Sequence, residues 1–572
     1  MSVDYLIQGK VKPLVPGPEL GRLSPAALAR LSSQLAGPAA TGADEARPRA
    51  RRREQGAYFT PEPLVELVVG EALSARLRRS PPRWRDDGSP ELVVLDPAAG
   101  DGRFLAAAAD LLAEAAVARG LDRAAARAAI ARRCLVGIER DPEFAALARA
   151  RLGATIHCAE ALLSPVGRDL SADVVVGNPP YLRSIRLGLA DERLRQALRG
   201  RYAATSHGEW DLYAAFLEQA MDWAAPGGEV ALVVPSRWLT ARCAALLRGK
   251  LAEARAVRAL VLFGAEQIFP GATTYASVVF LSRARQDRVI VARHGSTWQV
   301  GEVPAGELDH APWRLSVGRR RALVERLARQ GPPLARVARV AKGAGTNADP
   351  VFVLSPEAAA GLEPTLLRPC LRGRDVEAFG AARQLRVLVP YARDGRFIEP
   401  DELRSRYPRA ADYLAGHRGA LEQRERGRFR GPEFYRFGRP QNMAWLSAPA
   451  PKLVVPDVAR GGRALIDRRA AMVLDSAYAI RPTAGEVSLG LLLAIFNSGV
   501  VGLWLRETGV PLRGGYVRLK TAYLEPLPLP PRSRFTAAAE SAALARDAAG
   551  RRDEIDDLVR RAYGIDRSDW LG

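Results

Sequence analysis

VVLDPAAGDGRF, residues 93 to 104, joins an apolar run to a glycine-rich turn and then to a helical segment. Asp96 ends the apolar run, and Gly100 and Gly102 lie in the turn. Glycines at such a turn let a ligand approach the backbone closely, and ligands of open α/β sheets bind outside the carboxyl ends of the strands. The stretch therefore predicts a βα unit with a ligand site at its turn, although a tight turn without a ligand explains it equally well.

Short β-branched runs alternate with longer amphipathic runs from residue 90 onward. This pattern predicts an α/β fold with a mostly parallel sheet that helices cover on both faces. The runs at 258–264 and 275–281 are separated only by AEQIFPGATT. Because ten residues are too few for a helical crossover, we expect these two runs to pair as an antiparallel edge of the sheet.

The chain has 572 residues, which suits two or three domains. After residue 290 glycine, proline and arginine become frequent, and the strand–helix rhythm ends. The helical pattern in SPAALARLSSQLA lies in an extension whose basic run, Arg47 to Arg53, fits a DNA contact or a solvated linker. The expected divisions are an N-terminal extension (1–50), the α/β domain (51–290), a connector (291–330), an α+β domain (331–532) and a helical tail (533–572).

The composition indicates a polyanionic partner in a reducing compartment. The formal net charge is +21, which favours nucleic acid because clustered basic side chains neutralise phosphates. The four cysteines have no C-x-x-C spacing, and no apolar run approaches the ~20 residues that span a bilayer. We expect a cytoplasmic protein without a membrane partner or a metal site.

Three acidic residues end three successive predicted strands: Asp96, Glu139 in VGIERD and Glu160 in HCAEAL. A carboxylate at the second position can accept both ribose hydroxyls of a nucleoside, and one at the third can accept a hydrogen of the adenine amino group. No G-x-G-x-x-G is present at the first turn to seat a pyrophosphate. The pattern favours S-adenosyl-L-methionine over a nicotinamide cofactor.

DVVVGNPPYL, residues 173 to 182, places a polar amide and an aromatic ring on a stiff turn after the fourth strand. The Asn178 side-chain oxygen and the Pro179 carbonyl can accept both hydrogens of a heteroaromatic amino group, which localises its lone pair for attack on a methyl group. Pro179 and Pro180 fix φ, and Tyr181 can stack on a base rotated out of a duplex. A proline-stiffened strand exit with a buried tyrosine is the alternative.

These segments together resemble the gamma-class, TaqI-like adenine-N6 DNA methyltransferases. The resemblance covers residues 55 to 285 in the family's order, with two departures: Asp101 stands where Ser is common, and Glu160 where Asp is usual. It is carried by GAYFTP, LDPAAGDGRF, IERD, VVGNPPY, DLYAAFLEQAMDWAAPGGEVALVVPSRWL and IFPGATTYASVVF.

The resemblance implies a class I S-adenosylmethionine-dependent methyltransferase fold and a set of roles. Phe269 becomes the second wall of the flipped-base pocket, opposite Tyr181, and Phe216 packs on the cofactor adenine. Core packing is the alternative for both phenylalanines. The implied cofactor-binding set is Thr60, Pro61, Asp96, Pro97, Ala98, Gly100, Gly102, Glu139, Glu160 and Phe216.

The C-terminal half resembles the target-recognition region of the same group through LLRPCLRGRDVEAF, KLVVPDVAR, LLAIFNSGVVGLWL and LPLP. The segment RERGRFRGPEFYRFGRPQNMAW, residues 424 to 445, interleaves arginine with aromatic residues, which suits phosphate contact together with stacking or base-edge reading. A solvated arginine-rich loop is the alternative. The expected DNA contacts are Arg428, Arg430, Arg436 and Arg439.

The expected activity is methylation of adenine N6 in duplex DNA, as the modification component of a restriction-modification or phage-defence system. No acidic pair followed by Glu-x-Lys was found in the first 50 residues or the tail, so we expect any nuclease to be a separate chain or subunit. Two alternatives stay open: a methyltransferase of another acceptor, such as RNA or protein glutamine, and a DNA-binding specificity or scaffold protein with an inactive methylase half.

Overall fold

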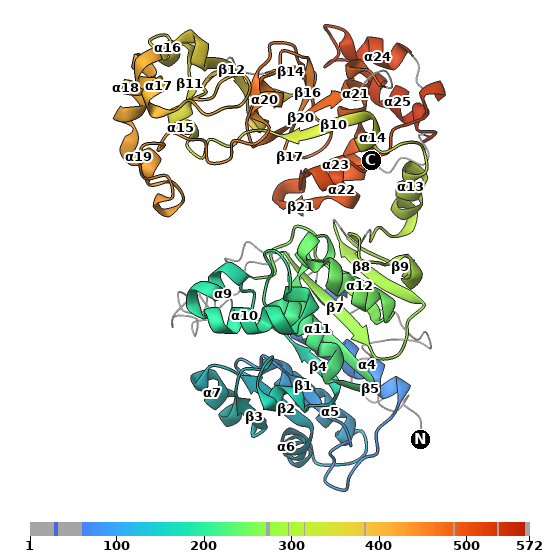
Figure 1. Cartoon of the computed structure of the whole chain (residues 1–572). Coiled ribbons are helices and arrows are strands. Elements are labelled where there is room, and N and C mark those ends of the chain that lie inside the picture. The colour runs from blue at the N-terminus through green and yellow to red at the C-terminus, as the bar shows by residue number, and fades with distance from the viewer. Residues whose placement is uncertain are drawn as a thin grey trace. The chain divides into compact units, whose positions relative to one another are not determined.

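The computed structural model divides into two compact units, Met1–Gly318 and Arg319–Gly572 (Figure 1). Residues 28–31 are helical, within the helix expected in SPAALARLSSQLA. The basic run from Arg47 to Arg53 and the start of GAYFTP lie outside the described residues. The structure describes residues 28–31, 60–269, 275–295, 297–313, 315–381, 385–483, 487–534 and 537–566.

Strands of the first unit form one sheet, nine-stranded among the described residues, in the order β3-β2-β1-β4-β5-β7-β6-β8-β9. Five neighbouring strands, β3, β2, β1, β4 and β5, pair in parallel. The strands are β1 Val94–Asp96, β2 Leu135–Glu139, β3 Thr155–Cys158, β4 Ala172–Gly177, β5 Ala224–Pro235, β6 Val257–Leu262, β7 Ala276–Ser282, β8 Arg288–His294 and β9 Trp298–Pro304.

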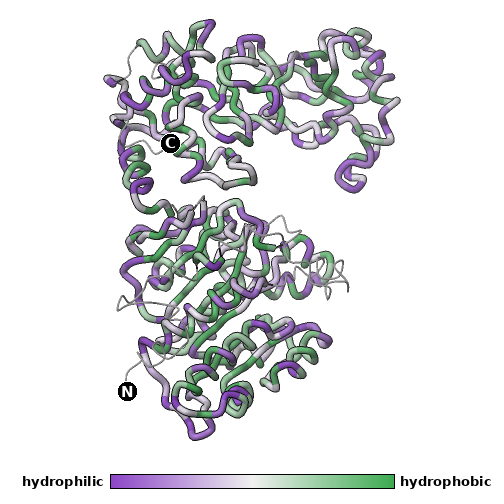
Figure 2. Tube along the Cα trace, turned by 180° about the vertical axis from the view of Figure 1, so that it is seen from behind, coloured by the Kyte–Doolittle hydropathy of each residue, from purple (hydrophilic) through white to green (hydrophobic). Residues whose placement is uncertain are grey.

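Hydrophobic cores lie on both faces of this sheet, because each buried parallel strand contributes successive side chains to opposite faces. Val94 and Val174 belong to one core, and their neighbours Leu95 and Val175 to the other. The tube in Figure 2 is accordingly hydrophobic along the strands of this sheet. Continuous apolar runs such as DVVVG are thus explained by burial on two sides.

Helices cover both faces, and the first core contains side chains of α4, α5, α6 and α7. The second core contains side chains of α9, α10, α11 and α12 (Figure 1). Their bounds, with short α8, are α4 Glu62–Arg79, α5 Arg103–Val117, α6 Arg123–Cys134, α7 Pro142–Leu152, α8 Pro165–Arg168, α9 Ser184–Ala190, α10 Glu192–Arg201, α11 Tyr213–Trp223 and α12 Ala245–Glu253.

The expected fold class is confirmed, with one difference in the position of the antiparallel strand. Strand β7 pairs antiparallel with β6, as the short connection requires, but also with β5, so it lies inside the sheet. Strand β8 then joins β6 in parallel, and β9 pairs antiparallel with β8 at the end of the sheet. The edge strand is therefore β9 and not β6 or β7 as expected, because residues 288–304 form two further strands of the sheet.

The second unit has small sheets in the orders β10-β20-β16-β18, β11-β15-β12-β19, β13-β14 and β17-β22-β21. The first of these is antiparallel throughout. The strands of the second unit are β10 Ala338–Lys342, β11 Val353–Leu354, β12 Leu367–Leu371, β13 Val376–Glu377, β14 Gly380–Ala381, β15 Leu385–Leu388, β16 Lys452–Pro456, β17 Val458–Ala459, β18 Leu465–Asp467, β19 Met472–Val473, β20 Ala477–Pro482, β21 Val510–Leu512 and β22 Tyr516–Arg518.

Helices of the second unit belong to its two hydrophobic cores, one containing α21, α22 and the C-terminal α25. Ile555, Val559 and Tyr563 of α25 and the loop after it are buried there. The helices are α13 Gly318–Ala328, α14 Leu334–Val337, α15 Asp349–Phe352, α16 Pro356–Ala359, α17 Pro400–Arg406, α18 Pro408–Gly416, α19 Arg418–Glu422, α20 Met443–Ser447, α21 Leu489–Phe496, α22 Gly499–Thr508, α23 Thr521–Leu524, α24 Ala537–Leu544 and α25 Arg552–Ala562.

The structure differs from the expected domain boundaries in two places. The limit expected at residue 290 falls inside β8, and the first unit continues to Gly318. The segment expected as a tail after residue 532 shares a core with α21 and α22. Both differences have one cause. The expected boundaries followed the change in amino-acid composition, whereas the unit to which a segment belongs depends on the core in which its apolar side chains are buried.

A search of the described helices for membrane-spanning length and hydropathy finds no single helix that qualifies. Helices α21 and α22 pass that test only together, with a bend of 67° between them.

The buried ion pair between Lys452 and Asp467 predicts a large stability effect in the second unit. Lys452 Nζ donates to Asp467 Oδ2 at 2.7 Å, and both side chains are almost fully buried. Lys452→Met leaves an uncompensated buried carboxylate, so we expect the unfolding free energy to fall by about 3–5 kcal/mol. Arg404→Met, which breaks the exposed pair with Asp401, is the control and should cost less than about 1 kcal/mol. Denaturant unfolding measures both; equal losses would contradict the prediction.

Candidate active site

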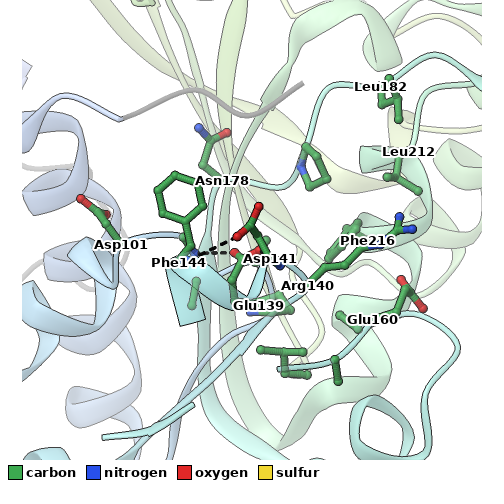
Figure 3. A pocket seen from close by; sticks show the side chains of 18 of the residues that line it. Asp101, Glu139, Arg140, Asp141, Phe144, Glu160, Asn178, Leu182, Leu212 and Phe216 are labelled. Atoms are coloured by element: carbon green, nitrogen blue, oxygen red, sulfur yellow. Dashed lines mark hydrogen bonds between the residues drawn. The ribbon is translucent and has the colours of Figure 1, made fainter. Parts of the chain in front are cut away.

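A cavity of about 530 Å³ opens at the carboxyl ends of β1, β2, β3 and β4 (Figure 3). Its walls include the turn after β1, Glu139 at the end of β2, Glu160 after β3 and Asn178 after β4. The volume lies within the range of small-molecule and cofactor sites. Parallel strands that end at one edge thus bring together residues spread over more than 80 positions of the chain.

The turn after β1 shows why its two glycines differ. Gly100 has φ +53°, and a Cβ built there would meet nothing within 4 Å, so the backbone borders open space in the cavity. Gly102 has φ +81°, and a Cβ there would lie 2.7 Å from Leu152 Cδ1. Gly100 therefore permits close approach of a ligand, whereas Gly102 permits packing of α5 against α7.

Glu139 projects from the end of β2 into the cavity and is fixed by backbone donors. Its Oε2 accepts from the Gly100 amide and its Oε1 from the Asp141 amide, both at 2.8 Å. Burial raises the pKa of this carboxyl, and the backbone hydrogen bonds oppose the rise. Each oxygen keeps lone-pair capacity for a hydroxyl donor, as a ribose contact requires.

Glu160 also lines the cavity, but its carboxylate is engaged in its own turn. Its oxygens accept from the amides of Leu162 and Leu163, at 3.0 and 2.6 Å. Two aromatic side chains, Phe144 of α7 and Phe216 of α11, line the same cavity (Figure 3). The cavity therefore offers a carboxylate for hydroxyls and apolar ring surface for a flat group.

Asn178 stands at the cavity, and its amide is oriented by Thr60. Asn178 Nδ2 donates to Thr60 Oγ1 at 3.1 Å, across 118 positions of sequence. Thr60 is itself buried, and its carbonyl accepts from Arg103 Nη1 at 2.6 Å. With the amide nitrogen directed at Thr60, the orientation of the Asn178 side-chain oxygen is set as well.

Tyr181 and Phe269 are brought together, but not as parallel walls. Their ring centroids are 5.9 Å apart at an interplanar angle of 76°, an edge-to-face contact. Phe269 is buried, and Tyr181 also contacts Tyr213 edge-on and donates to the Val233 carbonyl at 3.3 Å. A flat base does not fit between two rings in this arrangement, so the expected pocket between them needs a displacement of Phe269.

Asp96 is fully buried at the end of β1, next to the turn that follows β4. Its Oδ1 accepts from the Ala98 amide at 3.0 Å, and a Cβ built on Gly177 would lie 2.6 Å from the same oxygen. Burial raises the pKa of Asp96 to about 8, with Glu139 and Asp101 adding to the rise. The Asp96 carboxyl is therefore largely neutral at pH 7.

The cavity gathers most, though not all, of the expected site. The expected residues that line the cavity are Thr60, Pro97, Ala98, Gly100, Glu139, Glu160, Phe216, Asn178 and Pro180. The expected residues that do not line it are Asp96, Gly102, Pro61, Pro179, Tyr181 and Phe269. Lining residues that the sequence reasoning did not single out include Phe144, Arg103, Leu182 and Leu212. The N-cap pattern Asp141-Pro142 at the start of α7 could have indicated Phe144, since it places that ring in the first turn beside Glu139.

Most arginines of the arginine-rich segment of the second unit are exposed, but three of its five aromatic residues are buried. Phe434, Tyr435 and Phe437 are buried, which excludes them as stacking platforms in this structure. All three belong to one hydrophobic core of the second unit. Of the four expected DNA-contacting arginines, all exposed, Arg428 and Arg436 are 3.0 Å from Glu425 and Glu433.

A strained turn in this segment holds a further arginine, Arg426, which is not among the four expected DNA contacts. Glu425 and Arg426 are both left-handed, with φ of 47° and 62°, a conformation that costs non-glycine residues free energy. Arg424 anchors the turn by donating to the carbonyls of Leu421, Thr346 and Phe434. Arg426 is thereby held at the exposed surface.

Two family models match separate parts of the chain. Residues 134–269 match the Eco57I restriction-modification methylase model, and residues 398–529 match the TaqI-like C-terminal specificity domain model. The expected resemblance to TaqI-like methyltransferases with a C-terminal recognition domain is therefore confirmed in both halves.

Individual relatives extend this similarity over the length of the chain. The Type II methyltransferase M.XhoI of Xanthomonas vasicola is 26% identical over 563 residues, which covers 90% of this chain and 98% of the relative. M.BstVI of Geobacillus stearothermophilus is 22% identical over 577 residues, with 90% and 97% covered. The chain is accordingly a DNA methyltransferase of the restriction-modification type.

One solved structure, the Type IIL restriction-modification enzyme MmeI in complex with DNA, has the same fold. The TM-score is 0.64 at 15% sequence identity, covering 91% of this chain and 78% of that one. RM.Eco57I of Escherichia coli, a Type II restriction enzyme and methyltransferase, is 24% identical over 402 residues, with 63% of this chain and 40% of the relative covered.

The neutral Asp96 predicts a pH-dependent stability. The folded pKa of about 8 lies above the ordinary value of 3.8, so the folded state retains a proton that the unfolded chain releases. The contribution of Asp96 to stability is greatest below pH 3.8 and declines as the pH rises to about 8.

We therefore expect Asp96→Asn to gain stability relative to the unsubstituted protein as the pH is raised from 5 to 8. Thermal unfolding without added ligand, measured at both pH values, checks this. A difference in Tm that stays constant or shrinks would contradict it.

Proposed function

We propose that the protein transfers the methyl group of S-adenosyl-L-methionine to the N6 amino group of an adenine flipped out of duplex DNA. The observation that carries the proposal is the place of Asn178: it follows β4, borders the cavity and has its amide oriented by Thr60. An amino-group acceptor at this position would lie beside any ligand held by the neighbouring strand ends.

The cavity residues fit S-adenosylmethionine. Glu139 offers a fixed carboxylate for the ribose hydroxyls, and Gly100 leaves the backbone open to close approach. Phe144 and Phe216 supply apolar ring surface for the adenine. When bound, the cofactor supplies an electrophilic methyl group. Glu160 and Asp96 stay candidates for the adenine amino group and the amino-acid part.

The catalytic turn would activate the acceptor without a strong base. The Asn178 side-chain oxygen and the Pro179 carbonyl accept the two amino hydrogens, which localises the nitrogen lone pair and stabilises the charge that develops on methyl transfer. Tyr181 stacks on the flipped base. Because Phe269 now occupies the space opposite Tyr181, entry of the base requires that this ring move aside.

The second unit would select the DNA site. Its exposed Arg426, Arg428, Arg430, Arg436 and Arg439 suit contacts to phosphates and to guanine edges. The match to the TaqI-like specificity model supports this assignment. We infer a cytoplasmic modification enzyme of a restriction-modification or phage-defence system, with cleavage performed by another chain.

The direct test is methylation with tritiated donor and assorted duplexes, followed by nucleoside analysis and mapping of the modified positions. We expect N6-methyladenine within one sequence context. Methylcytosine alone, or label in RNA or protein but not in DNA, would overturn the proposal.

Asn178→Ala should lower the single-turnover rate by at least about 100-fold, the usual loss for a preorganised hydrogen-bonding group. Cofactor affinity and DNA affinity should change little. Thr60→Val, which removes the partner of the amide, should give a smaller loss because the Asn178 oxygen remains. Normal rates in Asn178→Ala would exclude its role.

Alanine substitutions at Gly100 and Gly102 distinguish an effect on cofactor binding from an effect on folding. Gly100→Ala adds a methyl group into the open cavity, so we expect cofactor affinity to fall by about tenfold, or about 1.4 kcal/mol, with a stability cost of roughly 1 kcal/mol from its positive φ.

Gly102→Ala is the matched control, because its new methyl group would meet Leu152 rather than the cavity. It should lower Tm more than Gly100→Ala does. Calorimetric titration and thermal unfolding measure the two effects; an unchanged affinity in Gly100→Ala would contradict the assignment of the cavity.

A further inference from the structure

Helix α9, which begins three residues after Tyr181, carries two exposed apolar side chains. Ile185 is 55% and Leu189 is 72% exposed. Among the large apolar side chains found exposed in the described residues, these two have the highest values, and no other two share a helix. Their i, i+4 spacing places them on one face.

The position of α9 relative to the catalytic turn is fixed. The Ser184 amide donates to the Trp210 carbonyl and the Leu212 amide to the Leu182 carbonyl, each at 2.8 Å, with a bridge between Arg183 and Asp211. Leu187 is buried in the core and, like Ala190, lines the cavity. The inner face of α9 thus forms part of the cavity wall, and its outer face exposes Ile185 and Leu189.

Basic side chains lie close to this apolar face in the chain. Arg183, Arg186 and Arg193 are exposed, and no ion pair of these three is found within the described part of the chain. The neighbouring acids are engaged: Glu192 lies 2.5 Å from Arg195, and Asp191 3.6 Å from Arg140. Exposed apolar side chains beside exposed arginines, next to the turn after β4, match the stacked bases and flanking phosphates of a duplex.

We propose that Ile185 and Leu189 form a wedge that enters the base stack and fills the space left by the flipped adenine. Extruding a base costs both unstacking and unpairing, and aliphatic side chains that enter the base step replace part of the lost stacking. Arg183, Arg186 and Arg193 hold the adjacent phosphates. This inference rests on the proposed function, since it requires that the substrate base leave a duplex.

The experiment compares the double variant Ile185→Ser/Leu189→Ser with the control Leu147→Ser/Leu246→Ser. The control residues are 50% and 48% exposed on α7 and α12 and do not line the cavity. Single-turnover methylation is measured on the duplex mapped for the unsubstituted enzyme. It is repeated on the same duplex with a mismatch opposite the target adenine, where unpairing costs less. Calorimetric titration follows S-adenosylmethionine affinity.

The wedge predicts that the α9 variant loses about tenfold or more in rate on the paired duplex, and under about threefold on the mismatched one. Cofactor affinity should be unchanged, and the control variant should behave as the unsubstituted enzyme on both duplexes.

Equal losses on both duplexes would overturn the wedge and indicate a general docking or folding role for α9. Full activity on the paired duplex would overturn it as well, and would leave a protein partner or a second copy of the chain as the occupant of this face. If the unsubstituted enzyme methylates neither duplex nor any other DNA, the proposed function fails, and the wedge with it.

Discussion

The parallel pairing of β1 with β2 on one side and β4 on the other is the constraint on which the candidate site depends. Val94 is in register with Leu135 and with Val174, so the carboxyl ends of the three strands lie at the same edge of the sheet. Chain order reverses around β1, which makes this a point where α/β sheets bind ligands. The glycine turn, Glu139 and Asn178 become neighbours only through this pairing.

Polar groups at these strand ends are held by backbone amides, by a neighbouring hydroxyl or by burial. Glu139 receives two backbone amides, Asn178 is oriented by Thr60, and Asp96 is kept protonated by burial. Such groups need little rearrangement when a ligand arrives, because their orientation is already set. In contrast, arginines near the turn after β4 and on the second unit are exposed and accessible to a polyanion.

The sequence was sufficient for the fold class and the mostly parallel sheet, because both depend on local periodicity and turn chemistry. The roles expected for the glycine turn after β1 and for the Asn178 turn stay predictions. The sequence-based predictions were wrong or incomplete for features that depend on tertiary packing. The last two strands of the sheet lacked a helical partner to mark them, and the burial of Phe434, Tyr435 and Phe437 is invisible in a mixed arginine-aromatic segment. The contact of Phe269 with Tyr181 depends on side-chain geometry, and the exposure of Ile185 and Leu189 on tertiary neighbours, so neither follows from spacing.

Close contact between Gly177 and Asp96 limits how this enzyme can vary. A side chain at 177 would collide with the Asp96 carboxyl at 2.6 Å, and Asp96 cannot withdraw because its Oδ1 is bonded to the Ala98 amide. The side chains at positions 96 and 177 therefore compete for the same space between the turn after β1 and the turn after β4. A methyl group gained at 177 requires a shorter residue at 96, so the two positions should change together or not at all as related sequences diverge.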